Sequence, residues 1–257
     1  MSPDTARLVV LGVMGLLVGS FLNVCIHRLP RDLSVVSPGS HCPSCRKPLR
    51  WYHNVPVLSW LLLGRRCGFC RAPISWRYPA VEVLNAALWM LHGVVFEWDA
   101  LLVVRLAFAT ALLVLFFTDL DCRILPNEIT VGGMVAGVVA SMLLPPGLVS
   151  SLLGVLLGGG VLWATGAAYE KVRGVEGMGM GDVKMLAMIG AVLGWPSMLL
   201  TLVWASLVGG LVGAVLLLFR ADARTTALPF GSFLAPAALA ASLVGQPVLD
   251  WYLGFYR

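Results

Sequence analysis

The chain has 257 residues, of which 59% are hydrophobic and only 12% are charged, and its formal net charge is +5. This composition excludes an ordinary soluble globular protein, in which about a quarter of the residues are charged. Apolar runs of nearly twenty residues recur along the chain, so we expect an all-α polytopic membrane protein. The basic excess is then explained by membrane topology, and no nucleic-acid partner is expected.

About eight apolar segments are predicted to cross the membrane as helices. The first is interpreted as a retained helix and not as a cleaved signal, because no small-residue A-x-A site follows it. The sixth is the shortest. The predicted segments are 8–26, 79–97, 100–118, 129–145, 149–169, 184–195, 197–219 and 229–246.

The basic residues predict the orientation of these helices. The connections 27–78, 119–128, 170–183 and 220–228, with their immediate flanks, hold 15 of the 18 Lys and Arg residues. Short loops rich in Lys and Arg stay in the cytoplasm, so we expect these connections on the cytoplasmic side and both termini on the other side.

The first cytoplasmic connection, residues 27–78, is the only polar stretch large enough for a domain, which divides the chain into 1–26, 27–78 and 79–257. It contains two C-x2-C pairs separated by 21 residues, a spacing typical of a structural zinc site. Two disulfides are the alternative, which a cytoplasmic location disfavours. His41 is a further possible ligand. The four predicted ligands are Cys42, Cys45, Cys67 and Cys70.

Other small residues have structural interpretations. Cys25 and Cys122 stand alone near predicted helix ends and are expected to pack as small residues. The glycine run in 154–166 is expected to let helices approach closely. The G-x-G of residues 179–181 lacks the strand and third glycine of a nucleotide-binding fingerprint.

Two aspartates stand at the ends of predicted spans on the same side of the membrane. Asp119 follows the third apolar run, and Asp182 precedes the sixth within "EGMGMGDVKM". Two carboxylates in a partly desolvated site can share a proton, one acting as acid and the other as base. Glycines beside them would let an extended peptide backbone approach. The sequence therefore suggests an aspartic protease.

A structural interpretation of these aspartates is also open. Asp182 could cap a helix, since carboxylates at helix N-termini accept free N–H groups. Asp119 could pair with Arg123. Spacing alone favours this second interpretation.

Several motifs together resemble the bacterial type IV prepilin peptidase family. Asp119 followed seven positions later by Pro126 matches the first half of its signature, and the G-x-G-D of residues 179–182 matches the second. Residues 19–30, "GSFLNVCIHRLP", resemble the family's opening motif, and the cysteine-rich loop is similar throughout.

The resemblance implies an inner-membrane enzyme whose active site faces the cytoplasm. Such enzymes cut the basic leader of type IV prepilins and pseudopilins after a glycine, and use S-adenosylmethionine to methylate the new amino terminus. By this match Asp119 and Asp182 would be the catalytic pair, and Asp121, five positions before Pro126, is excluded by the spacing. The implied substrate-binding residues are Gly179, Gly181, Glu176 and Lys184.

Three further expectations concern neighbouring positions. Asn127 stands where many relatives carry Asp. Asn54 and Glu82 are expected to contribute to methyl transfer. Because the cytoplasmic face is itself basic, local acidic groups are expected to receive the basic leader. The candidates are Glu176, Asp121 and Glu128.

Two other functional classes compete with the enzyme. A non-catalytic membrane scaffold with a zinc loop would not need the two aspartates for its function. A proton-coupled transporter would be favoured by ionisable residues near the middle of a span, whereas here the carboxylates gather at one face.

Overall fold

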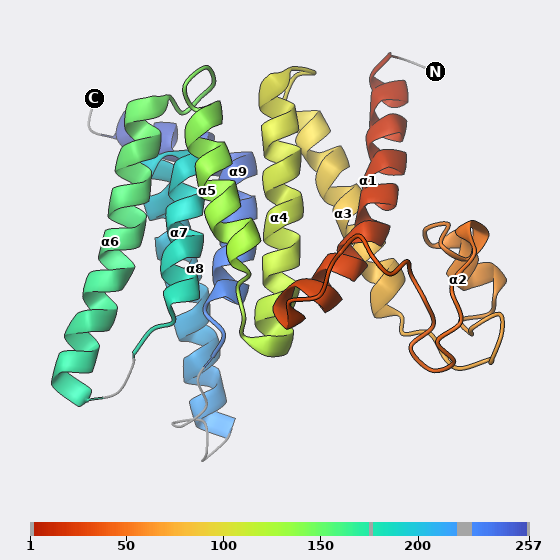
Figure 1. The fold of residues 1–257 in the computed structure, drawn as a ribbon. Coiled ribbons are helices and arrows are strands. Elements are labelled where there is room, and N and C mark those ends of the chain that lie inside the picture. The colour runs from red at the N-terminus through yellow and green to blue at the C-terminus, as the bar shows by residue number, and fades with distance from the viewer. Residues whose placement is uncertain (1–2, 175–176, 220–227, 256–257) are drawn as a thin grey trace. The chain divides into compact units, whose positions relative to one another are not determined.

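In the computed structural model, which describes residues 3–174, 177–219 and 228–255, the chain is helical and has no β-strand within those ranges (Figure 1). The helices are α1 (Pro3–Arg28), α2 (Leu58–Leu62), α3 (Arg77–Val95), α4 (Ala100–Cys122), α5 (Asn127–Ala140), α6 (Leu148–Arg173), α7 (Met180–Leu193), α8 (Trp195–Phe219) and α9 (Gly231–Gly254). Two short 3-10 helices, Leu29–Arg31 and Trp51–His53, lie in the loop after α1.

Within the described ranges, five helices are long and apolar enough to cross a membrane. They are Asp4–Arg31, Ala100–Cys122, Leu148–Arg173, Trp195–Phe219 and Gly231–Gly254. The other three predicted spans coincide with α3, α5 and α7. α5 and α7 have 14 residues each, or about 21 Å of helix, which is less than the ~30 Å hydrocarbon core of a bilayer. Eight spans therefore remain a prediction.

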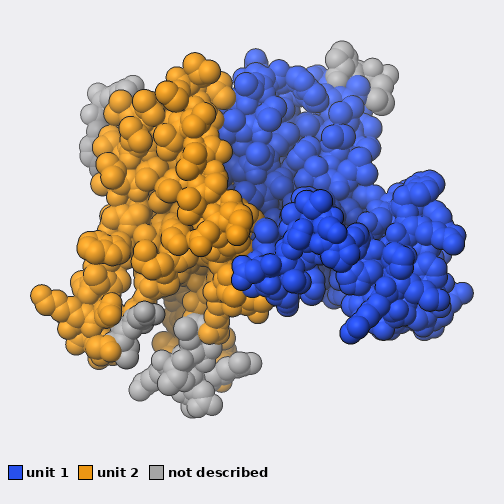
Figure 2. All heavy atoms as spheres, viewed as in Figure 1, with its two compact units in different colours: residues 1–114 blue, residues 115–257 orange. Residues whose placement is uncertain are grey.

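The chain forms two compact units, residues 1–114 and 115–257, coloured separately in Figure 2. Unit 1 contains α1, α2, α3 and most of α4. Unit 2 contains the end of α4 and helices α5 to α9. Both proposed catalytic aspartates belong to unit 2, whereas the cysteine-rich loop belongs to unit 1.

In unit 1, α1 packs closely on α3 because α1 presents glycines to it. A Cβ atom at Gly15 or at Gly19 would lie 2.7 Å from the Cα atom of Ala86 or Glu82, respectively. Close approach also brings the Asn85 side-chain amide to 2.8 Å from the Gly15 carbonyl. These two glycines form a G-x-x-x-G pattern, a common signal for close helix packing in membranes.

In unit 2, α7 is the central helix and packs against α5, α6, α8 and α9. Its residues from Met185 to Leu193 are all buried. α6 approaches it through glycines, since a Cβ atom at Gly154 would lie 2.3 Å from the Gly190 carbonyl oxygen and one at Gly158 would lie 2.8 Å from that of Leu186. The packing role predicted for the glycine run is confirmed at these two positions.

Candidate active site and metal centre

The four cysteines predicted as metal ligands lie together in unit 1. Their Sγ atoms are all within 4.8 Å of one another, and the Cys42 and Cys70 Sγ atoms are 3.8 Å apart. Sulfur atoms at ~2.3 Å from a tetrahedral zinc ion are about 3.8 Å apart, so the cluster fits Zn²⁺. All four thiols are free, which argues against the disulfide alternative. The cluster contains no histidine, so His41 is not needed as a ligand.

The two C-x2-C pairs form matching turns. In the first, the Arg46 N–H donates to the Cys42 carbonyl at 2.8 Å, and in the second the Arg71 N–H donates to the Cys67 carbonyl at 3.0 Å. Arg46 and Arg71 both adopt left-handed backbone angles, with φ of 56° and 61°. In each turn, therefore, the arginine that follows the C-x2-C pair is the residue with positive φ.

The first carboxylate of the candidate active site is Asp119, near the end of α4. It is only 4% exposed, and its Oδ2 atom accepts the backbone N–H of Ser232 at 2.6 Å. Its neighbour Asp121 is exposed. Of the two aspartates in this segment, the buried one is therefore the one with the seven-residue spacing to Pro126.

The second carboxylate, Asp182, is in the first turn of α7, outside the five membrane-length helices. Gly179 is the N-cap residue of α7, so Asp182 is not the N-cap itself. As the acidic residue of the first turn it still suits the helix dipole, as the structural interpretation expects. The Gly231 backbone N–H donates to the Asp182 carboxylate. Its Oδ1 atom is buried and has no hydrogen-bond partner among the described residues.

The start of α9 brings the two carboxylates together. Gly231 and Ser232 are consecutive, and their N–H groups serve Asp182 and Asp119 respectively. A helix N-terminus presents free N–H groups and a partial positive charge, which suits two acidic groups. A Cβ atom at Gly231 would lie 3.0 Å from Asp119 Oδ2, so the absence of a side chain there lets the backbone approach.

This arrangement makes the Asp182 carboxyl a weaker acid than an ordinary aspartate. The pKa of the Asp182 carboxyl is raised from 3.8 to about 7. Burial is the largest cause, the nearby Asp119 charge adds to it, and the hydrogen bond from the Gly231 N–H opposes the increase. A carboxyl with a pKa near 7 can give up or take a proton at physiological pH, which is what acid–base catalysis requires.

The residues expected to bind substrate have different environments. Lys184 donates from Nζ to Asn127 Oδ1 at 2.8 Å, so Asn127 joins the two halves of the signature. A Cβ atom at Gly181 would lie 3.1 Å from Leu125 Cβ, which ties the same two segments together. Gly179 has more space, since only Asp182 Oδ2 at 3.7 Å and the Gly181 nitrogen at 4.0 Å lie near its missing Cβ.

The acidic residues expected to receive the leader are Asp121, Glu128 and Glu176. Asp121 and Glu128 are both exposed in unit 2. Glu176 lies outside the described residues.

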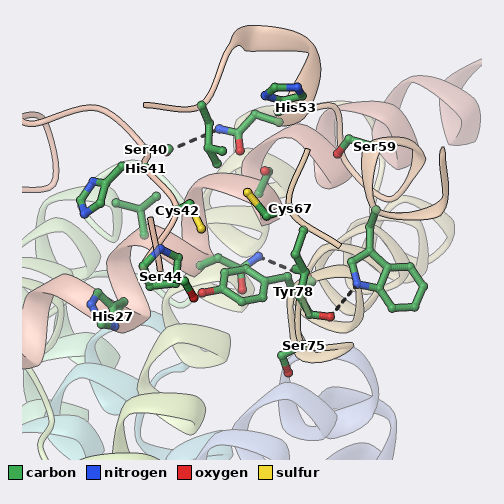
Figure 3. A pocket seen from close by; sticks show the side chains of 18 of the residues that line it. His27, Ser40, His41, Cys42, Ser44, His53, Ser59, Cys67, Ser75 and Tyr78 are labelled. Atoms are coloured by element: carbon green, nitrogen blue, oxygen red, sulfur yellow. Dashed lines mark hydrogen bonds between the residues drawn. The ribbon is translucent and has the colours of Figure 1, made fainter. Parts of the chain in front are cut away.

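The residues expected to serve methyl transfer line a cavity of about 700 Å³ in unit 1, shown in Figure 3. Glu82 is buried, and one of its carboxylate oxygens accepts the Val57 N–H at 2.8 Å. Asn54 lies on the cavity wall, with its side-chain nitrogen 3.5 Å from the Ser40 hydroxyl. The structure therefore brings both residues to one concave site.

Sequence reasoning missed Gly231 and Ser232, which hold the two aspartates. They occur in "PFGSF", where a Pro-Gly segment directly precedes an apolar run. That signal predicts the beginning of a helix, but it gives no indication that Gly231 and Ser232 lie beside carboxylates 49 and 113 positions earlier, respectively.

Comparisons with known proteins agree with the motifs. Residues 13–96 match the model of the Bacterial Peptidase A24 N-terminal domain, and residues 106–214 match that of the Type IV leader peptidase family. A Prepilin leader peptidase/N-methyltransferase of Aeromonas hydrophila is 37% identical over 94% of this chain and 92% of its own length. Proteins of the same name from Pseudomonas aeruginosa and Myxococcus xanthus are 36% and 44% identical, over 95% and 84% of this chain and 92% and 66% of their own lengths. No solved structure matches the chain.

Proposed function

This chain belongs to the Type IV leader peptidase family, and on that premise we propose that it removes the leader from type IV prepilins or pseudopilins and methylates the new amino terminus. The leader is cut after a glycine at the cytoplasmic face of the inner membrane. The observation that carries the peptidase proposal is the pair of aspartates, the buried Asp119 and the half-buried Asp182, bound by consecutive N–H groups of α9.

In the proposed hydrolysis, Asp119 is the ionised partner and Asp182 the protonated one. Asp119 takes a proton from a water molecule as the water oxygen attacks the scissile carbonyl, while Asp182 gives its proton to the carbonyl oxygen. The tetrahedral intermediate then returns a proton to Asp182 as the carbonyl re-forms. Asp119 gives its proton to the leaving amine, which restores both carboxyl groups.

We propose the eight-span topology for this enzyme, with residues 27–78 in the cytoplasm. Eight of the described helices, all except α2, coincide with the predicted segments. The concentration of 15 of the 18 basic residues on or beside four connections supports the orientation. In this arrangement Asp182 and the end of α4 lie at the cytoplasmic edge of the membrane.

Substrate contacts are proposed at the loop before α7. Gly179 leaves space beside Asp182 for an extended backbone, and Glu176 would attract the basic leader together with Asp121 and Glu128. Gly181 and Lys184 would form the floor of this site, where they already join the residue 125–127 segment.

The metal and methyl donor are assigned to unit 1. Cys42, Cys45, Cys67 and Cys70 would hold a structural Zn²⁺, because four thiolates leave no open position for catalysis. The relatives are named N-methyltransferases, and S-adenosylmethionine, the donor that the family resemblance implies, would supply the methyl group.

The decisive test is cleavage of a prepilin peptide by the purified chain and by single Asp→Asn variants. Asp119→Asn and Asp182→Asn should each reduce cleavage about 100-fold or more, the scale of general acid–base catalysis. Asp121→Asn is the matched control and should keep the wild-type kcat, with at most a higher KM, because Asp121 is proposed to attract the leader and not to take part in the chemistry. Full cleavage by both of the first two variants would exclude the aspartyl mechanism and favour the scaffold.

A further inference from the structure

The cavity in unit 1 has the size and position of a small-molecule site. Its volume is about 700 Å³, and pockets for drug-sized ligands span roughly 300–1,000 Å³. Its wall is built from the end of α1, the cysteine-rich loop and the beginning of α3. Figure 3 shows Cys42 and Cys67, two of the four clustered cysteines, on this wall together with His53 and Tyr78.

The cavity wall contains a single carboxylate. Glu82 is the one Asp or Glu among the residues that line it, and Arg28 is the one Lys or Arg. Arg28 is already engaged, since its guanidinium donates to the Ser34 and Gly39 carbonyls at 2.8 and 3.4 Å and so holds the loop in place. Among the Asp, Glu, Lys and Arg side chains of the wall, Glu82 is therefore the one that remains for a ligand.

Glu82 is positioned by the surrounding chain. It is 7% exposed and accepts hydrogen bonds from the Val57 N–H, at 2.8 Å, and from the Ser20 hydroxyl. Val57 directs its N–H to the carboxylate from a left-handed backbone conformation with φ of 60°, which a β-branched residue seldom adopts. A carboxylate has about four acceptor sites, so part of its capacity remains for a ligand.

The same wall offers flat rings. His53, Trp60 and Tyr78 all line the cavity, and the Trp60 indole is fixed by its Nε1–H, which donates to the Ile74 carbonyl at 3.1 Å. Flat aromatic side chains provide the surface on which a purine ring stacks. The cavity thus combines surfaces for a planar base with one buried carboxylate, and the neighbouring cysteines would add negative charge as zinc-bound thiolates.

We propose that this cavity binds S-adenosylmethionine, with the sulfonium group next to Glu82 and the adenine against the aromatic wall. The positive sulfur complements the single buried carboxylate, whose attraction is strengthened because Glu82 is only 7% exposed. This inference rests on the proposed methyltransferase function and adds to it the location of the donor and the residue that recognises its charge.

The chemistry of transfer is consistent with this placement. The lone pair of the peptide's neutral amine attacks the methyl carbon, the carbon–sulfur bond breaks, and the sulfur keeps the bonding pair. The product S-adenosylhomocysteine is a neutral thioether, and the methylated nitrogen now carries the positive charge until it releases a proton to water. Glu82 therefore faces a cation before transfer and a neutral sulfur afterwards.

That change of charge provides the test. The full-length chain in detergent is titrated with S-adenosylmethionine and with S-adenosylhomocysteine by isothermal calorimetry. The wild-type chain should bind the donor more tightly than the product. Glu82→Gln keeps an acceptor oxygen for Val57 but loses the charge, so it should weaken donor binding about tenfold while changing product binding little. Glu97→Gln removes an exposed charge of unit 1 outside the cavity and serves as the matched control.

A second variant separates charge from local structure. Glu82→Asp retains the charge on a shorter side chain, so it should keep the preference for the donor even if the Val57 hydrogen bond weakens. A wild-type chain that binds both compounds equally, or a Glu82→Gln variant that retains the donor preference, would overturn the proposal. Equal weakening of both compounds by Glu82→Gln would also overturn it, because that result indicates a structural role.

Failure of this inference can be distinguished from failure of the proposed function. Leader cleavage and methylation of a prepilin peptide are measured on the same samples. If the wild-type chain methylates the peptide but Glu82→Gln binds the donor as wild type does, only the assignment of this cavity is wrong. If the wild-type chain neither binds the donor nor methylates, the methyltransferase function itself is wrong.

Discussion

Replacing Asp182 with asparagine should remove a pH-dependent loss of stability. In the folded chain the Asp182 pKa is about 7 against an ordinary value of 3.8, because burial and the Asp119 charge disfavour ionisation. The folded state therefore binds an additional proton between these pH values, and stability falls as pH rises through them. The full difference corresponds to about 4 kcal/mol of unfolding free energy.

The effect should be measurable as a melting temperature. About 3 kcal/mol of the loss falls between pH 5 and pH 8, which corresponds to a decrease of roughly 6–12 °C for a chain of this size. Asp182→Asn should lack this decrease, since an amide does not ionise. Thermal unfolding of the purified chain in one detergent, followed across the pH range, provides the comparison.

The control is Asp121→Asn, which removes an exposed carboxylate in the segment that leads to Pro126. It should retain the wild-type dependence on pH. If Asp182→Asn and the wild-type chain lose the same stability between pH 5 and pH 8, the carboxyl is not protonated in the fold and the assignment of acid and base is refuted. On the same reasoning, wild-type leader cleavage should decline as pH rises through about 7, as Asp182 loses its proton.

Three other predictions test packing and the metal. Gly154→Ala would place a Cβ atom 2.3 Å from the backbone of the facing helix, so it should reduce the free energy of unfolding by about 1–3 kcal/mol and lower the melting temperature. Gly160→Ala is the control and should leave the melting temperature unchanged, because nothing lies within 4 Å of its added Cβ atom. Gly231→Ala would place a Cβ atom 3.0 Å from Asp119 Oδ2, so the rate of cleavage of a prepilin peptide should fall at least tenfold. Gly254→Ala is the control and should not change that rate, because nothing lies within 4 Å of its added Cβ atom. Cys42→Ser should abolish bound zinc in metal analysis and loosen the loop to limited proteolysis; retention of stoichiometric zinc would contradict a four-cysteine site.

Local sequence patterns predicted most of the secondary structure. Apolar runs must form helices in a membrane, because only helices and closed barrels satisfy every backbone group there. The first and last residues of helices α1, α4 and α8 accordingly lie within five residues of the ends of the predicted segments. Helix α9 continues to Gly254, eight residues beyond the predicted end, because Gly245 and Pro247 do not interrupt it.

The cysteine cluster could also be predicted from the sequence, because a C-x2-C turn is a local structure and two such turns can share one metal ion. What the sequence left open was its surroundings. The cavity beside Cys42 depends on α1, the loop and α3 meeting in space, and the hydrogen bond from Val57 to Glu82 joins positions 25 residues apart.

The sequence by itself determined the helical membrane class, the four cysteines that could hold a metal ion and, through its motifs, the family to which the chain belongs. Only the tertiary structure decided that Asp119 and Asp182 meet, because their 63-residue separation contains no periodic pattern that relates them. The contact is made by α9, whose first two N–H groups reach both carboxylates because α9 packs beside α7. Burial in that packed site, and not the identity of the residue, raises the pKa of Asp182 to about 7.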